Sequence, residues 1–137
     1  MQYFNALFLV FIGGGLGSVA RYGMGLLIFP WSQRFPLATM LANATACLIL
    51  GALTSMSMRG LLDDPRRLLL ATGFCGGFST FSTFTYETWS LFQTGQTANA
   101  ILNIFLSLSV CFLSLLLGMK IGGQGWGWVR DMKGRHK

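Results

Sequence analysis

A run of glycine, hydroxyl and phenylalanine residues at positions 72–84 lies in the middle of an apolar stretch that is long enough to cross a bilayer. It contains the pair Gly76 and Gly77, followed by hydroxyl residues from Ser79 to Thr83. Glycine adds backbone freedom, and serine and threonine hydroxyls compete for main-chain partners, so the run predicts an interrupted helix. Interrupted backbone at membrane depth survives only inside protein or beside a hydrated cavity. The run therefore predicts an ion or substrate site.

The composition places this run in a membrane protein. Apolar residues make up 53% of the chain and charged residues 10%, whereas soluble domains carry about 25% charged residues. The spacing predicts an all-α protein with four transmembrane helices at about 4–29, 37–58, 68–92 and 98–121, the third of them broken. At 137 residues, we expect one four-helix domain over 1–137, with a basic, tryptophan-containing tail from about 122 to 137.

The net charge of +6 is carried between and after the apolar spans. Basic residues spread in this way argue against nucleic-acid binding. With four spans, both termini and the loop at 59–67 share one side, and most of the basic residues fall there. The positive-inside rule therefore predicts cytoplasmic termini. Four short helices can hardly enclose a pore and also shield a broken helix from lipid. We therefore expect an oligomer, most simply one with two-fold symmetry.

Polar side chains inside the predicted spans are the candidate site residues. Arg21 lies about two turns inside the first span, so it faces a partner or a vestibule, or it extends to the interface. Thr39 and Asn43 are four apart on one face of the second span, which suits an interhelical hydrogen bond or a pathway. Glu87, the acidic residue of the third span, either pairs with Arg21 or lines a vestibule.

Hydroxyl groups form a stripe after the expected break. The spacing i, i+3, i+4 and i+7 predicts one shared helical face for Ser79, Ser82, Thr83 and Tyr86. Phe81 and Phe84 lie on a neighbouring face, so the pattern indicates a polar track beside an aromatic gate. Asn103 and Ser107 are four apart in the fourth span and are placed to join this track.

Other residues have structural interpretations. Glycines at 13–17 favour close helix packing in the first span. Asp63 and Asp64 before Pro65 suit a helix N-terminus rather than a catalytic pair. The cysteines are not spaced as a metal site or a disulfide framework, and we interpret Cys47, Cys75 and Cys111 as small packing residues.

Three stretches carry a resemblance to a known family. Residues 13–22 read Gly-Gly-Gly-Leu-Gly-Ser-Val-Ala-Arg-Tyr, residues 39–43 read Thr-Met-Leu-Ala-Asn, and residues 72–84 read Thr-Gly-Phe-Cys-Gly-Gly-Phe-Ser-Thr-Phe-Ser-Thr-Phe, with Glu87 after them. The third stretch is highly specific, and the first two are weak alone. In this order and four-span setting, the chain over about 11–118 resembles the fluoride-specific ion channel family, Fluc or CrcB.

The resemblance implies a passive, fluoride-selective channel in the cell inner membrane that lets fluoride leave the cytoplasm and lowers its toxicity. It implies an antiparallel, dual-topology dimer with two pathways along the interface. In that setting Asn43 would donate hydrogen bonds to the ion, Phe81 and Phe84 would present ring edges, and Arg21 would draw anions in. The hydroxyl track would include Ser82 and Thr83, and we add Thr39 and Asn103 to the pathway.

The resemblance also implies a structural sodium ion at the dimer centre, held by the backbone carbonyls of Gly76 and Ser79. The chain departs from the family pattern at two positions, with Ser79 where threonine is usual and Ala38 where glycine is usual. The basic tail biases insertion to one orientation, so a related subunit is kept as an alternative partner.

Two other functions remain as alternatives. A small multidrug-resistance-type exporter couples cation movement to protons through an acidic residue deep in its first span, and this chain has none there. A non-transporting assembly subunit accounts for the spans and glycines but not for the run at 72–84. An enzyme is not expected, because no nucleophile and base are placed together in the sequence.

Overall fold

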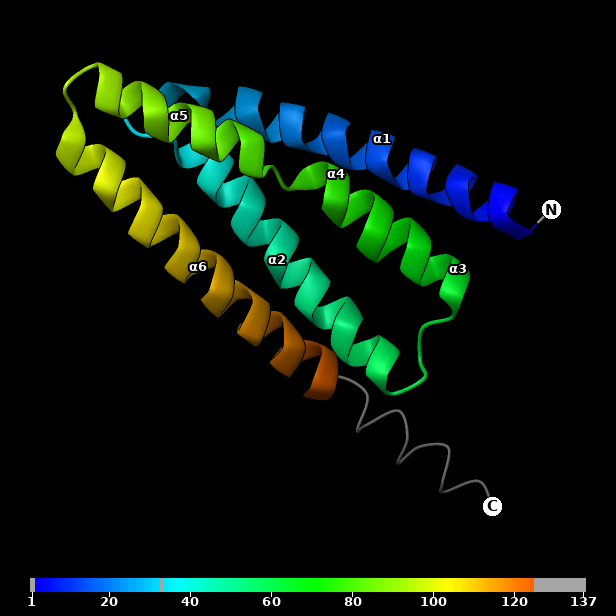
Figure 1. Cartoon of the computed structure of the whole chain (residues 1–137). Helices are drawn as coiled ribbons and strands as arrows, with labels where there is room; N and C mark the ends of the chain where they lie inside the picture. The colour runs from blue at the N-terminus through cyan, green and yellow to red at the C-terminus, as the bar shows by residue number, and fades with distance from the viewer. Residues whose placement is uncertain (1, 33, 125–137) are drawn as a thin grey trace.

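The computed structural model describes residues 2–32 and 34–124, and every regular element within these ranges is a helix (Figure 1). The first half of the chain forms α1 (Gln2–Ile28), the short η1 (Phe29–Trp31) and α2 (Leu37–Met58). The second half forms α3 (Asp64–Arg67), the wide-turned η2 (Leu68–Cys75), α4 (Gly76–Phe78), α5 (Phe81–Gln93) and α6 (Thr97–Gln124). The predicted all-helical class is confirmed.

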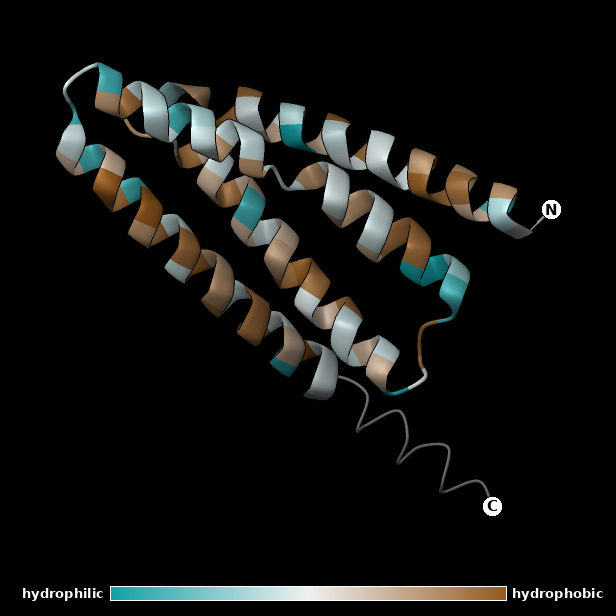
Figure 2. Ribbon diagram, in the orientation of Figure 1, coloured by the Kyte–Doolittle hydropathy of each residue, from teal (hydrophilic) through white to brown (hydrophobic). Residues whose placement is uncertain are grey.

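Three of the described helical segments are long and apolar enough to cross a membrane: Tyr3–Trp31, Leu37–Met58 and Thr97–Gly123. They agree with the predicted first, second and fourth spans to within about three residues. The predicted third span, 68–92, is divided among η2, α4 and α5. Figure 2 shows hydrophobic residues along α1, α2 and α6, with hydrophilic ones gathered at α3 and at the connections. The chain is a membrane protein with several apolar helices.

The helices pack in two sets that meet at α2. In Figure 1, α6 runs beside α2 along most of its length, and α1 runs beside η2 and α4. One end of the molecule carries the N-terminus, the connection after α2 and the end of α6. The opposite end carries the connection before α2 and the turn between α5 and α6. The first half of α2, at Asn43, contacts the junction of α4 and α5.

Glycine makes both close helix contacts possible. A Cβ atom at Gly17 would collide with the Phe74 backbone, and one at Gly118 would collide with the Leu48 backbone. These positions let main chains approach where larger residues would hold them apart. The predicted packing role of the first-span glycines is confirmed at Gly17, whereas Gly15 faces open space.

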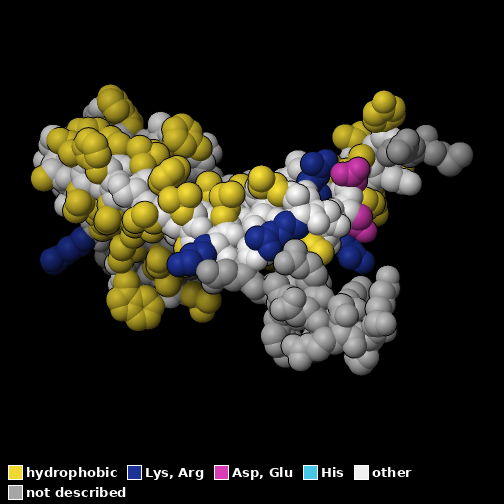
Figure 3. All heavy atoms as spheres, turned by 90° about the horizontal axis from the view of Figure 1, so that it is seen from below, with side chains coloured by type: hydrophobic (Ala, Val, Ile, Leu, Met, Phe, Trp, Pro, Cys, Tyr) yellow, Lys and Arg dark blue, Asp and Glu magenta, His cyan; other side chains and the backbone are white. Residues whose placement is uncertain are grey.

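The outer surface is apolar over much of its area. Figure 3 shows the face seen from below, where hydrophobic side chains gather on the half away from the acidic pair and Lys and Arg side chains are spread along the molecule. Phe11 is 75% exposed and Phe105 is 68% exposed, which suits contact with lipid tails. Near this acidic pair, the Asp63 carboxylate accepts a hydrogen bond from the Arg66 N–H at 3.0 Å, which confirms the predicted N-cap. The predicted tail falls outside the described residues from 125 onward.

Candidate functional site

The backbone leaves the helical conformation between α4 and α5. Ser79 has ψ 156°, and Thr80 has φ −151° and ψ 114°. Asn43 of α2 satisfies both main-chain groups of Thr80, because its Oδ1 accepts from the Thr80 N–H at 2.6 Å and its Nδ2 donates to the Thr80 carbonyl at 3.1 Å. An amide side chain thus does here what a neighbouring strand would do in a sheet.

The Thr80 side chain then starts α5. Its Oγ1 accepts from the Thr83 N–H at 3.2 Å and lies 2.9 Å from the Thr83 hydroxyl, and the Ser82 hydroxyl is 3.2 Å away. This is an N-cap, which stabilises a helix by about 1 kcal/mol. The hydroxyls at 80, 82 and 83 therefore form one connected group.

The hydrogen bonds of the Thr80 N–H and the Thr83 N–H take these donors away from the carbonyls that they would bind in a regular helix. In a continuous helix the Thr80 N–H would bond to the Gly76 carbonyl, and the Thr83 N–H would bond to the Ser79 carbonyl. Here those donors bond to Asn43 and to the Thr80 hydroxyl instead. Gly76 is also exposed. The carbonyls of Gly76 and Ser79 therefore fit the hard-oxygen ligands that an alkali cation needs.

Beside this segment lies a cavity of about 230 Å³, here named the amide–aromatic cavity. Its lining includes Asn43 and two phenylalanines, and the Phe81 and Phe84 ring centroids are 5.6 Å apart with the planes tilted by 43°. Phe84 is 9% exposed, whereas Phe81 is 74% exposed. The remaining lining residues are Cys47, Ser79, Thr80, Ser107, Leu108 and Cys111.

A second cavity of about 420 Å³, here named the charged cavity, contains both Arg21 and Glu87. The Arg21 Nε donates to the Gly77 carbonyl at 3.2 Å. The Glu87 Oε1 accepts from the Thr39 hydroxyl at 2.9 Å, and its buried Oε2 has no hydrogen-bond partner among the described residues. Among the two interpretations of Glu87, the structure favours the vestibule lining over an ion pair with Arg21.

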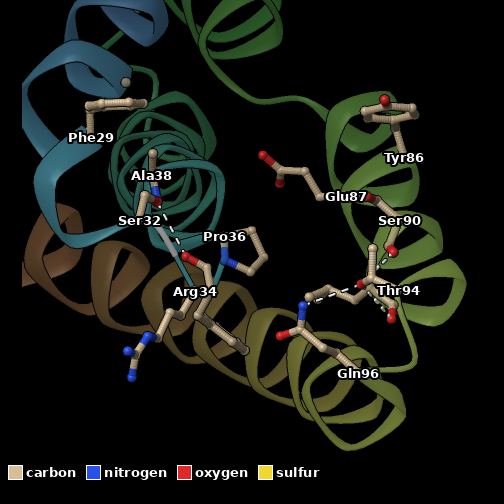
Figure 4. Close-up of a pocket in the computed structure, with 13 residues that line it drawn as sticks. Phe29, Ser32, Arg34, Pro36, Ala38, Tyr86, Glu87, Ser90, Thr94 and Gln96 are labelled. Atoms are coloured by element: carbon tan, nitrogen blue, oxygen red, sulfur yellow. Dashed lines mark hydrogen bonds between the residues drawn. The ribbon is translucent and has the colours of Figure 1, made fainter.

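An outer cavity of about 430 Å³ continues from the charged cavity, with which it shares Gly25, Phe29, Ala38 and Glu87. It reaches the end of the molecule at Arg34 and Gln96. Figure 4 shows the Glu87 carboxylate extending from α5 toward the segment that carries Pro36 and Ala38. Glu87 thus lies at the boundary between the outer and the charged cavity.

The structure sorts the predicted pathway residues into two groups. Asn43, Phe81 and Phe84 line the amide–aromatic cavity. The charged cavity is lined by Arg21, Thr39 and Thr83.

Two predicted residues line neither of these cavities. Ser82 is exposed beside Thr80. Asn103 is 1% exposed, donates to the Thr88 hydroxyl at 2.8 Å and accepts from the Ser107 hydroxyl at 3.1 Å. Their roles in the pathway stay predictions.

Thr80 was not among the predicted site residues, although it lines both cavities and holds the start of α5. In the sequence Thr80 is one member of the hydroxyl run at 79–83, and nothing in that pattern distinguishes it from Ser79 or Ser82. Ser18 was also missed. It donates to the Gly77 carbonyl at 3.4 Å and lines the charged cavity.

Comparison with known proteins places the chain in a family. A family model described as CrcB-like protein, Camphor Resistance (CrcB), matches residues 8–119. A relative from Pyrococcus furiosus named "Fluoride-specific ion channel FluC" is 46% identical over 111 residues, which cover 80% of this chain and 89% of the relative. Relatives with the same name occur in Prosthecochloris aestuarii, at 41% identity over 88% of this chain and 94% of the relative, and in Thermus thermophilus, at 40% identity over 84% and 93%. The chain therefore belongs to the CrcB-like family.

Proposed function

We propose that the chain forms a passive, fluoride-selective channel that releases fluoride from the cytoplasm and so lowers its toxicity. The carrying observation is the reciprocal bonding of Asn43 with Thr80, which holds the extended segment beside the two rings of the amide–aromatic cavity. The fluoride-channel names of relatives with 40–46% identity support the same function. Those names describe channels and not enzymes.

The cavity offers the groups that a fluoride ion needs in place of water. Fluoride is small and strongly hydrated, so a pore must present donors at short range. Asn43 uses one of its two amide N–H groups on the Thr80 carbonyl and keeps a second for an ion. The edges of the Phe81 and Phe84 rings carry the positive part of the ring quadrupole. Ser107 also lines the cavity, and its hydroxyl donates to the Asn103 Oδ1 at 3.1 Å.

The three cavities support a route for the ion. It opens at the end near Arg34 through the outer cavity, runs through the charged cavity and reaches the amide–aromatic cavity at Thr80, which borders the two inner cavities. Arg21 attracts the anion into the charged cavity, where Thr83 presents a hydroxyl donor and Thr39 holds the Glu87 carboxylate. Ser82 adds an exposed hydroxyl next to that of Thr80. Asn103 contributes by positioning Ser107, whose hydroxyl donates to its Oδ1.

In this proposal η2, α4 and α5 together make the third of four spans, broken at Ser79 and Thr80. The protein lies in the cell inner membrane. Two copies pair in antiparallel orientation, so that the exposed ring of Phe81, 74% exposed in the single chain, is covered by the partner copy. A related subunit is the alternative partner. The carbonyls of Gly76 and Ser79 hold a sodium ion between the copies, which balances the dipoles of the interrupted backbone.

Ion efflux from reconstituted liposomes tests the function. Vesicles loaded with fluoride, with a potassium ionophore to balance charge, should release fluoride when the protein is present. Vesicles loaded with chloride should retain it. Proton-coupled movement of organic cations in place of fluoride release would favour the exporter, and silence toward every ion would favour the assembly subunit.

The dimer is tested separately. The mass of the purified protein should be twice the 15.0 kDa of one chain. A protease site added to the C-terminus should be cut about equally from either side of the vesicle membrane if the copies are antiparallel. Complete protection from one side would contradict dual topology.

A further inference from the structure

Two of the three cysteines line the same cavity although they are far apart in the sequence. Cys47 is on α2 and Cys111 is on α6, the two helices that Gly51 and Gly118 bring into backbone contact. Both cysteines line the amide–aromatic cavity and both are half-buried. Each lies one helical turn before a residue of the Gly51–Leu115 backbone contact, so the two side chains stand on the same stretch of the α2–α6 packing. Cys75 is buried and does not line this cavity.

We propose that Cys47 and Cys111 form a two-thiol binding site for soft, two-coordinate cations, namely Cu(I), Ag(I) and Hg(II), in the wall of the amide–aromatic cavity. Thiolate ligands select soft metals. Within residues 2–32 and 34–124, no three His, Cys, Asp or Glu side chains gather around a common point. These described residues therefore offer no tetrahedral zinc site, and two thiols on neighbouring helices suit linear coordination.

The binding step balances without an oxidant or a reductant. Each thiol gives up its proton to water in the cavity, two metal–sulfur bonds form to one cation, and the ligands that the metal carried in solution leave it, which for HgCl2 are two chloride ions. With Hg(II) the product is neutral, so the apolar surroundings do not penalise it as they would a charged complex. The half-buried position of both thiols gives the ion a path from the cavity.

Occupation of this site has a consequence for ion flow. A metal bridging Cys47 and Cys111 lies in the same cavity as Asn43, Phe81 and Phe84. It takes up space in a cavity of about 230 Å³ and ties α2 to α6 beside the pathway. Fluoride flow then stops. This consequence rests on the proposed function, whereas metal binding does not.

Mercuric ion is the probe for binding. The purified protein receives one equivalent of HgCl2 and then an excess of a monothiol, and the intact mass of the chain is measured. The wild-type mass should rise by one mercury less two protons, because a chelate of two thiolates resists exchange. A chain that carries mercury together with the monothiol has only one protein ligand, and that result would overturn the site.

Variants identify the ligands. Cys47→Ser and Cys111→Ser should each carry mercury only together with the monothiol, whereas the matched control Cys75→Ser should keep the wild-type chelate. Alanine replacements at 47 and 111 repeat the test if a serine disturbs folding, and the wild-type mass stands without any variant. A chelate that survives in both single variants, or that is lost in Cys75→Ser alone, contradicts the assignment.

Flux is measured last, in the same liposomes with and without mercury. Wild-type fluoride release should fall to the level of empty vesicles, and Cys111→Ser should keep the rate that it shows without metal. Unchanged wild-type flux with the chelate in place would overturn the blocking role. Absent flux before mercury is added marks a failure of the proposed function and leaves the mass measurement valid.

Discussion

The two inner cavities meet at Thr80 but are built from opposite chemistry. The amide–aromatic cavity is lined by an amide, two rings, hydroxyls and thiols, with no charged side chain in its lining. The charged cavity is larger, about 420 Å³ against about 230 Å³, and holds Arg21 and Glu87. A narrow site without fixed charge binds an anion weakly enough to release it, whereas a wide charged one gathers ions from water. The amide–aromatic cavity is therefore suited to recognising the ion, and the charged cavity is suited to attracting it.

Replacing Asn43 should have the largest effect. Asn43→Ala removes both hydrogen bonds to the Thr80 backbone, and each group left buried and unpaired costs about 1–3 kcal/mol. We expect fluoride efflux at the level of empty vesicles and a lower melting temperature. Asn99→Ala, at the exposed start of α6, is the matched control and should conduct normally. Wild-type efflux in Asn43→Ala would remove the amide–aromatic cavity from the pathway.

Asn43→Asp sharpens this test. The carboxylate still accepts from the Thr80 N–H but offers no donor to the Thr80 carbonyl or to an anion. Efflux should therefore be lost here too, with a smaller loss of melting temperature than in Asn43→Ala. Equal destabilisation by the two changes would show that the acceptor bond matters little.

Phe81→Ile should come next. The change keeps an apolar side chain but removes the ring edge that faces an ion. Efflux should fall to near background while the dimer mass is unchanged, because isoleucine keeps an apolar side chain on the face that the partner copy covers. The fold of the single chain should also be kept, because Phe81 is 74% exposed there and contributes little to its core. Phe105→Ile, on the exposed face of α6, is the control. Efflux near the wild-type rate in Phe81→Ile would argue against an aromatic role.

Arg21→Gln should lower fluoride efflux several-fold but not abolish it. Arg21 raises the local concentration of the ion and does not form the narrow site. The loss should shrink as salt rises, because screening shortens the reach of a charge to about 10 Å at 0.1 M ionic strength. Efflux assays at several ionic strengths check this. Arg66→Gln, on the exposed α3, should change nothing. A salt-independent loss would point instead to the Arg21 bond with the Gly77 carbonyl.

Gly17→Ala should have the smallest effect on efflux and act on stability. The added Cβ meets the Phe74 backbone, and overpacking of this kind costs about 1–3 kcal/mol. Thermal unfolding in detergent should show the loss. Gly15→Ala faces open space and should be neutral. Equal stability of the two variants would indicate that α1 shifts freely, and with it the wall of the charged cavity.

Sequence patterns predicted the local features of the fold well. The predicted second span, 37–58, coincides with α2, and the acidic pair before Pro65 caps α3 as expected. Such features depend on hydropathy and on residues within one turn of each other. The division of the candidate site residues between two cavities was not predictable, because it depends on how α1, α2 and α5 pack around Thr80. Glu87 shows this, since its partner proved to be Thr39 and not Arg21.

The sequence by itself determined that this chain enters a membrane, where its apolar helices begin and end, and which family it joins, because hydropathy, caps and short motifs are local properties. Only the tertiary structure decided that Asn43 holds Thr80 and that Cys47 and Cys111 line one cavity. Both arrangements depend on the register of α2 against other helices. That register is set by glycine contacts between backbones distant in the sequence, which local patterns do not encode.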